Sequence, residues 1–132
     1  MNEIKFGVSL AGGGLQGLAH IGALKALEEL GVEIQYISGT STGSAIASLY
    51  AMGYTPDEIQ KICKEKYKKI LKIRKKVLCK MAINFLLHKE TRVEGIIDGT
   101  LVENFINEAA KEKGKHMIKD FTSKKLAIAT VD

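Results

Sequence analysis

Two short apolar runs near the start of this chain are each followed by a glycine-rich turn and then by a helical pattern. Residues 4–10 precede Gly12-Gly13-Gly14-Leu15-Gln16-Gly17, and residues 34–37 precede Gly39-Thr40-Ser41-Thr42-Gly43. Continuous apolar runs are typical of buried parallel strands, and right-handed crossovers bring the ends of such strands to one edge of a sheet. We therefore expect both turns at the carboxyl edge, where open α/β sheets hold their sites.

The rest of the chain continues the alternation of strands and helices. Apolar residues recur at helical spacing over 18–30, small residues fill 44–52, and a last apolar run covers 126–131. Capping-box signals open two further helices, one at Thr55 and Glu58 and one at Thr100 and Glu103. The predicted order is β-α-β-α-α-α-β, which is an α/β fold.

Size and composition indicate one ordered domain. The chain has 132 residues, of which 45% are hydrophobic, and it has no basic, apolar leader or run of about 20 apolar residues. Its two cysteines, Cys63 and Cys79, lie on a predicted helix roughly 24 Å apart at 1.5 Å per residue, which is beyond bonding distance. These features predict a protein of the reducing cytoplasm.

The second glycine turn matches the G-x-S-x-G nucleophile elbow, in which a strained strand-to-helix turn exposes a serine hydroxyl. Ser41 is the candidate nucleophile, and Gly39 and Gly43 supply the small neighbours that a sharp turn needs. The backbone N–H of Thr42 is a candidate oxyanion donor. By itself the motif also fits an ordinary Gly/Ser/Thr turn.

The first glycine turn can present a row of backbone N–H groups to an anion at a helix start. Gly12, Gly14 and Gly17 also satisfy G-x-G-x-x-G, so a nucleotide-binding α/β domain that uses this loop is an alternative. That alternative expects an acid about 20 residues further on, and Ser38-Gly39 occupies this place. A nucleophile beside an anion trap is the better-supported interpretation, and it predicts acyl transfer by serine.

These paired motifs resemble those of the patatin-like phospholipases. Residues 12–24 resemble the oxyanion loop and first helix of that family, 39–43 its nucleophile elbow, and 93–99 with 126–132 the approach to its third core strand. The resemblance implies a three-layer fold around a mainly parallel sheet, with 1–132 as the N-terminal part of the domain. It also implies lipid acyl-ester hydrolysis by a Ser-Asp dyad, with no metal or cofactor.

The chain departs from the family pattern at two points. Gln16 stands where the family usually has Arg or Lys, which removes a local positive charge. In the family, the base is the aspartate of an Asp-Gly-Gly or Asp-Gly-Ala motif late in the domain. Neither Asp98 nor Asp132 of this chain fits that place. We therefore expect the dyad aspartate beyond residue 132 and the isolated chain to be nearly inactive, because a serine needs a base. His20 is expected to pack or hydrogen-bond near the sheet rather than to act as that base.

A basic helix is predicted over residues 61–80, which hold ten of the twenty Lys and Arg residues and one acid, Glu65. It is either a solvated face or an interfacial helix that binds anionic lipid at the inner face of the membrane. Only one aromatic residue, Tyr67, lies in it, so nucleic-acid binding is disfavoured. A non-catalytic lipid-binding module remains a further alternative to an enzyme.

Overall fold

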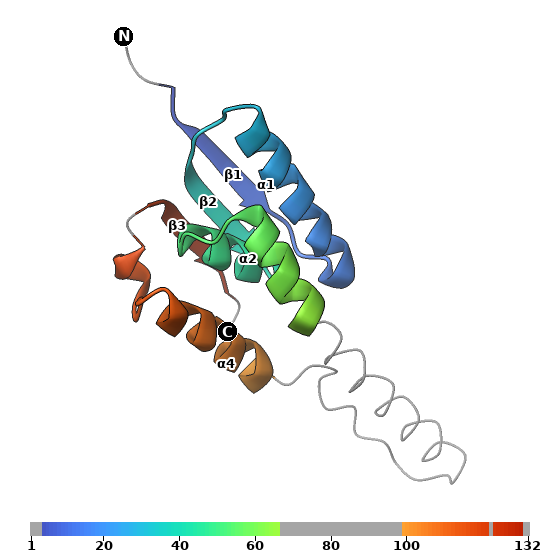
Figure 1. Ribbon diagram of the computed structural model, residues 1–132, viewed down its shortest axis with the longest axis vertical. Coiled ribbons are helices and arrows are strands. Elements are labelled where there is room, and N and C mark those ends of the chain that lie inside the picture. The colour runs from blue at the N-terminus through green and yellow to red at the C-terminus, as the bar shows by residue number, and fades with distance from the viewer. Residues whose placement is uncertain (1–3, 67–98, 122, 131–132) are drawn as a thin grey trace, which may run out of the picture.

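A computed structural model describes residues 4–66, 99–121 and 123–130. Residues 56–66 are helical, and the remaining elements are shown in Figure 1. In chain order these are the strand β1 (Phe6–Leu10), the 3-10 helix η1 (Gly14–Leu18), α1 (Ala19–Glu29), β2 (Ile34–Thr40), α2 (Thr42–Ala51), α4 (Gly99–Glu112), the 3-10 helix η2 (Ile118–Asp120) and β3 (Lys125–Ala129). The predicted α/β order is confirmed where it is described. The basic segment beyond residue 66 and Cys79 lie outside the described residues.

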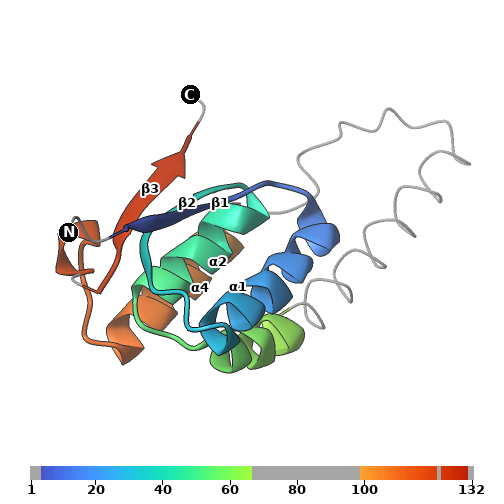
Figure 2. The same cartoon turned by 90° about the horizontal axis from the view of Figure 1, so that it is seen from above.

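The three strands form one parallel sheet in the order β1-β2-β3. Leu10 pairs with Gly39, and Gly39 pairs with Ile128, so the carboxyl ends of the strands are level. Both glycine turns therefore leave the sheet at the same edge, as the sequence predicts. In the described part of the chain, α1, α2 and α4 all cover one face of the sheet and leave the other face open (Figure 2). The sheet and the helices on its covered face are two of the three layers that the family resemblance implies.

The core lies between the sheet and α2. Leu24 of α1, Ile37 of β2 and Leu49 of α2 are all at most 2% exposed, and burying a side chain of this size stabilises the fold by about 1.5–3 kcal/mol. Ala47 and Ala51 of α2 are also buried. These small residues let α2 approach the strands closely, as its composition predicts.

Hydrogen bonds fix the helices to one another. The Tyr50 hydroxyl of α2 donates to Glu28 Oε1 of α1 at 2.7 Å, and burial raises the pKa of Tyr50 above its usual value. The Tyr54 hydroxyl lies 2.9 Å from the Ala109 carbonyl oxygen of α4, and burial raises its pKa to about 12. Both phenols therefore stay protonated donors at neutral pH.

One of the two predicted capping boxes is confirmed. The Thr55 backbone N–H donates to Glu58 Oε2 at 2.7 Å, and the Glu58 N–H donates to Thr55 Oγ1 at 3.3 Å. The second prediction places Thr100 ahead of its helix, whereas α4 begins at Gly99, so Thr100 lies inside the first turn. Of the helices in the described ranges, none is long and apolar enough to cross a membrane.

Candidate active site

Ser41 occupies the junction between β2 and α2 in a strained backbone conformation. Its φ is 53° and its ψ is −124°, and within the described ranges no other residue except glycine has a positive φ. Such a conformation costs on the order of 1–3 kcal/mol, and surrounding structure must hold it in place. The Ser41 carbonyl oxygen accepts the Ser44 N–H at 2.9 Å, which starts α2. This is the local geometry that a nucleophile elbow requires.

Two glycines allow the elbow to pack against main chain. A Cβ on Gly39 would lie 2.4 Å from the Gly43 carbonyl carbon, and a Cβ on Gly43 would lie 2.3 Å from the Leu10 carbonyl oxygen. Real Cβ atoms essentially never come so close. Gly39 and Gly43 therefore have no room for a side chain, and this contact presses the start of α2 against the end of β1.

Both ends of the first glycine loop contact the elbow. A Cβ on Gly12 would lie 3.1 Å from Ser41 Cβ and 3.8 Å from Ser41 Oγ, and one on Gly17 would lie 2.9 Å from Thr42 Cγ2. Segments that are more than twenty residues apart in the sequence thus lie side by side. The structure brings Gly12 and Gly17 to Ser41 and Thr42, as the sequence predicts.

The middle of the loop is exposed and turns through glycine conformations. Gly13 has φ 152° and Gly14 has φ 56°, and the Gln16 N–H donates to the Gly13 carbonyl oxygen at 3.1 Å. The N–H groups of Gly12 and Gly13 donate to no acceptor in the part of the chain that the structure describes. They are therefore available to an external anion.

His20 holds the beginning of the same loop. Its Nε2 lies 2.9 Å from the carbonyl oxygen of Ala11, the residue before Gly12. A carbonyl only accepts, so Nε2 carries the proton in this contact. The predicted hydrogen-bonding role of His20 is confirmed, but its partner was not identifiable from the sequence. A histidine in the first turn of the helix after the loop is the only signal.

The basic segment is described only up to residue 66. Lys66 Nζ lies 2.7 Å from Glu108 Oε2 and 5.4 Å from the centre of the Phe105 ring, so it joins its helix to α4. Lys61 and Lys64 are exposed. Asp98 and Asp132 lie outside the described residues, as does most of the predicted basic helix.

The chemistry available in the described residues is that of a serine hydroxyl beside free backbone donors. Ser41 Oγ has no hydrogen-bond partner among these residues, and no group of three His, Cys, Asp or Glu side chains in them could hold a metal ion. A hydroxyl attacks a carbonyl only when a base takes its proton. The described part of the site thus places an unpaired serine hydroxyl beside backbone N–H groups that have no acceptor among these residues.

Comparison with known proteins finds a match to one protein family and to several individual relatives. The model of the family described as "Patatin-like phospholipase" matches residues 8–130. The chain is 56% identical over 48 residues to Lysophospholipase NTE1 of Kluyveromyces lactis, covering 36% of this chain and 3% of that protein. It is 49% identical over 53 residues to Patatin-like phospholipase domain-containing protein ZK370.4 of Caenorhabditis elegans, covering 40% of this chain and 4% of that protein. The chain thus spans only a few per cent of these relatives, and no solved structure matches it.

Proposed function

This chain belongs to the patatin-like phospholipase family, and we propose that it carries the nucleophile and the oxyanion-binding groups of a serine lipid acyl hydrolase. The observation that carries the proposal is the contact between the strained Ser41 and Gly12, whose N–H is free in the described part of the chain. Catalysis of acyl transfer needs a nucleophile and preorganised donors around one carbonyl.

In the proposed reaction, Ser41 Oγ attacks the ester carbonyl carbon and its proton passes to a base. The carbonyl oxygen becomes an oxyanion, which accepts hydrogen bonds from N–H groups of Gly12, Gly13, Gly14 and Thr42. Collapse of this intermediate expels the alcohol, which takes up the proton, and leaves an acyl-serine. Water then attacks the acyl-serine and releases the fatty acid. One oxyanion donor of this kind accounts for about 10²–10³ in rate in serine hydrolases.

The base in this proposal is an aspartate beyond residue 132, which together with Ser41 forms a Ser-Asp dyad. The support is the family membership and the lack of any partner for Ser41 Oγ among the described residues. The isolated 132-residue chain should therefore turn over esters very slowly. The named lysophospholipases among its relatives favour a phospholipid or lysophospholipid ester as substrate.

We further propose that the protein acts in the cytoplasm and binds lipid at a membrane surface. The exposed Lys61 and Lys64 belong to the basic segment that would make this contact. A basic residue near an anionic bilayer adds about 1 kcal/mol to binding. Binding to anionic vesicles should weaken with salt and with neutralisation of these lysines, and salt-independent binding would remove the membrane role.

Fluorophosphonate labelling tests the nucleophile directly, because the reagent phosphonylates an activated serine and releases fluoride. We expect slow labelling of one serine in the full 132-residue chain, measured by intact mass and peptide mapping. Ser41→Ala should abolish it, whereas the matched variant Ser44→Ala, in the first turn of the same helix, should retain it. Equal labelling of both variants would remove Ser41 from the mechanism.

The same samples distinguish the remaining alternatives. A nucleotide-binding domain would be stabilised against thermal unfolding by NAD or ATP, and a non-catalytic lipid-binding module would bind vesicles without reacting with fluorophosphonate. The packing of Gly12 and Gly17 against Ser41 and Thr42 favours the hydrolase, since a nucleotide loop has no need of a serine at that contact.

A further inference from the structure

The opposite edge of the sheet, at the amino-terminal ends of the strands, carries a pocket of about 280 Å³. The residues that line it come from the start of β1, from β2 and from the approach to β3: Lys5, Gln35, Tyr36, Ser123, Lys124 and Lys125. A strand rises about 3.3 Å per residue, so Gln35 and Ser41 are separated by about 20 Å along β2. This amino-edge pocket is therefore distinct from the candidate active site.

The charge of the amino-edge pocket is entirely positive. Three of its six lining residues are lysines and none is acidic. Elsewhere Lys25, Lys66 and Lys113 form ion pairs with carboxylates. By contrast, no carboxylate of the described residues lies within 4.0 Å of the ammonium groups of the three pocket lysines. Three lysines that have no carboxylate partner among the described residues favour an anionic ligand.

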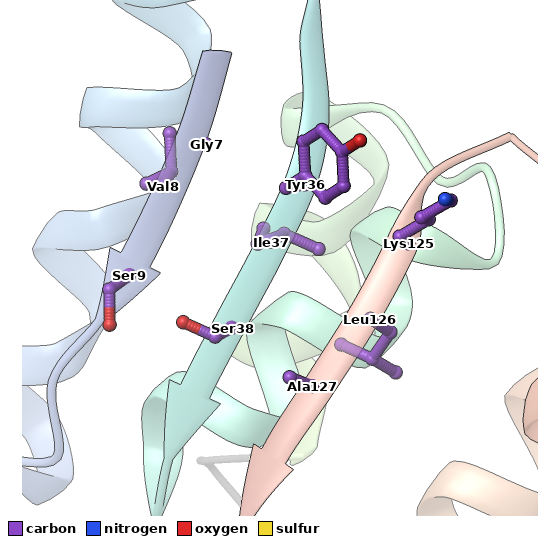
Figure 3. A pocket seen from close by; sticks show the side chains of 9 residues that line it. All are labelled: Gly7, Val8, Ser9, Tyr36, Ile37, Ser38, Lys125, Leu126 and Ala127. Carbon is purple, nitrogen blue, oxygen red and sulfur yellow. The ribbon is translucent and has the colours of Figure 1, made fainter. Parts of the chain in front are cut away.

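Aromatic rings position two of these ammonium groups without neutralising them. Lys124 Nζ lies 4.3 Å from the centre of the Tyr50 ring, and Lys125 Nζ lies 5.6 Å from that of Tyr36. Tyr36 and Lys125 are directly paired on neighbouring strands. Figure 3, which draws the lining of a second pocket farther along the strands, shows their side chains next to each other on β2 and β3. The rings attract the cations by their π faces. Tyr36 also lines the pocket and so holds the Lys125 ammonium group there, whereas Tyr50 is a buried residue of α2 outside the lining.

One lining residue of the pocket, Gln35, has a polar side-chain atom that lacks a partner. Gln35 Oε1 is buried and accepts no hydrogen bond from any described residue. The neighbouring Ser123 hydroxyl donates to the Ala51 carbonyl oxygen at 3.0 Å, so its hydrogen is already used. A buried acceptor without a donor is destabilising. A ligand hydroxyl in the pocket would supply the missing donor once the Gln35 side chain turns its oxygen toward the pocket.

We propose that the amino-edge pocket binds a small phosphate ester that carries a free hydroxyl group. The phosphate oxygens accept hydrogen bonds from the ammonium groups of Lys5, Lys124 and Lys125, and the hydroxyl donates to Gln35 Oε1. Glycerol phosphate is the simplest compound with both groups. It occurs as a soluble compound and as the headgroup of phosphatidylglycerol. The pocket is small for a ligand site, which suits a headgroup better than an acyl chain.

Titration of the full chain with glycerol 3-phosphate, followed by calorimetry and by backbone amide shifts of residues 35, 36 and 123–125, tests the proposal. Binding should exceed that of inorganic phosphate, and glycerol alone should not bind. Lys125→Gln should weaken binding about tenfold, the size expected for one charged hydrogen bond. The matched variant Lys119→Gln, an exposed lysine of η2 outside the pocket, should change it less than twofold.

Gln35→Leu should remove the preference for glycerol 3-phosphate over inorganic phosphate. Lys124→Gln serves in place of Lys125→Gln if thermal unfolding shows that the latter is not folded. The absence of millimolar binding, or equal weakening by the lysine variant and by Lys119→Gln, would overturn the proposal. It makes no use of Ser41, so Ser41→Ala should bind normally even if the hydrolase proposal fails.

Vesicles distinguish the two sources of the ligand. Binding to phosphatidylglycerol vesicles that free glycerol 3-phosphate displaces and Lys125→Gln weakens identifies the lipid headgroup. Binding of free glycerol 3-phosphate, with equal vesicle binding by Lys125→Gln and Lys119→Gln, identifies the soluble compound. Phosphatidic acid vesicles, which are anionic but have no free hydroxyl on the headgroup, should compete less well in the first case.

Discussion

The two edges of the parallel sheet differ in their packing: main chain contacts main chain at one edge, and long side chains surround a hollow at the other. At the carboxyl edge, glycines replace side chains, and Gly39, Gly43 and Gly12 bring main chain to within contact of main chain or of Ser41. At the amino edge, long side chains such as Lys124 and Lys125 surround an open hollow. Backbone donors have fixed positions, whereas lysine ammonium groups adapt. Gly39 and Gly43 at the carboxyl edge should therefore tolerate no larger residue, and the amino edge should tolerate many substitutions.

The largest expected effect on stability is that of Gly43→Ala. The new Cβ would meet the Leu10 carbonyl oxygen at 2.3 Å, and neither backbone segment can move without disturbing the sheet. We expect a loss of about 3 kcal/mol or more in the free energy of unfolding, at the severe end of single substitutions. Chemical denaturation measures it.

Gly22→Ala is the matched control, because Gly22 lies within α1 and a Cβ there would meet nothing within 4 Å. Removing a glycine from a helix interior should stabilise the protein by about 0.5–1 kcal/mol. Similar losses for both variants would show that the contact at Gly43 is not tight.

The next effect concerns the strain at Ser41. Glycine accepts a φ of 53° readily, whereas alanine does not. Ser41→Gly should therefore raise the free energy of unfolding by about 1 kcal/mol, and Ser41→Ala should leave it nearly unchanged. Both variants lose the candidate nucleophile, so a gain in Ser41→Ala as well would mean that the hydroxyl rather than the backbone is the source of the strain.

The tether between His20 and Ala11 should have a moderate effect. His20→Ala removes one hydrogen bond, which contributes about 1 kcal/mol, and frees the start of the glycine loop. Amide hydrogen exchange of Gln16, whose N–H donates to the Gly13 carbonyl oxygen within this loop, should become several times faster, by about the factor that this energy implies. His20→Gln, which keeps a donor, should recover part of the protection. Unchanged exchange in His20→Ala would show that the loop is held by the glycine contacts alone.

The smallest expected effect is the pH dependence of stability that the Thr55 capping box contributes. The Thr55 backbone hydrogen bond lowers the pKa of Glu58 below its ordinary 4.5. The stabilisation is therefore complete above that value and is lost as the pH falls through the lower, folded pKa. For so exposed a group we expect no more than about 0.5 kcal/mol between pH 6 and pH 3.

Glu58→Gln should abolish this part of the pH dependence in denaturation measured at both pH values. Glu33→Gln, an exposed acid in the loop before β2, controls for the loss of one charge and should not. The prediction fails if the two variants respond to pH alike.

Sequence patterns predict the carboxyl edge well because its signals are local. Each strand run, turn and helix start lies within about ten residues, and G-x-S-x-G already specifies the strain at Ser41. The 3-10 helix that begins within the glycine loop at Gly14, and the place of Thr100 inside α4, were not predicted. Both are shifts of a turn or less that depend on how a helix end packs.

The amino edge could not be predicted in this way. Lys5, Gln35 and Lys125 come from three separate segments, and only the register that pairs Tyr36 with Lys125 brings them together. Nothing in the neighbouring sequence fixes such a register before the strands pack. The partner of His20 could not be predicted either, because the path of the loop that contains the Ala11 carbonyl depends on its contact with Gly43.

Gly43 packs directly against the carbonyl oxygens of Leu10 and Ala11. Contacts between main-chain atoms therefore set the distance between the candidate nucleophile, Ser41, and the candidate oxyanion donors of the glycine loop. Their spacing is consequently indifferent to whatever residues line the route by which a lipid arrives. Substrate preference can drift through changes along that route while the reacting distances stay as they are.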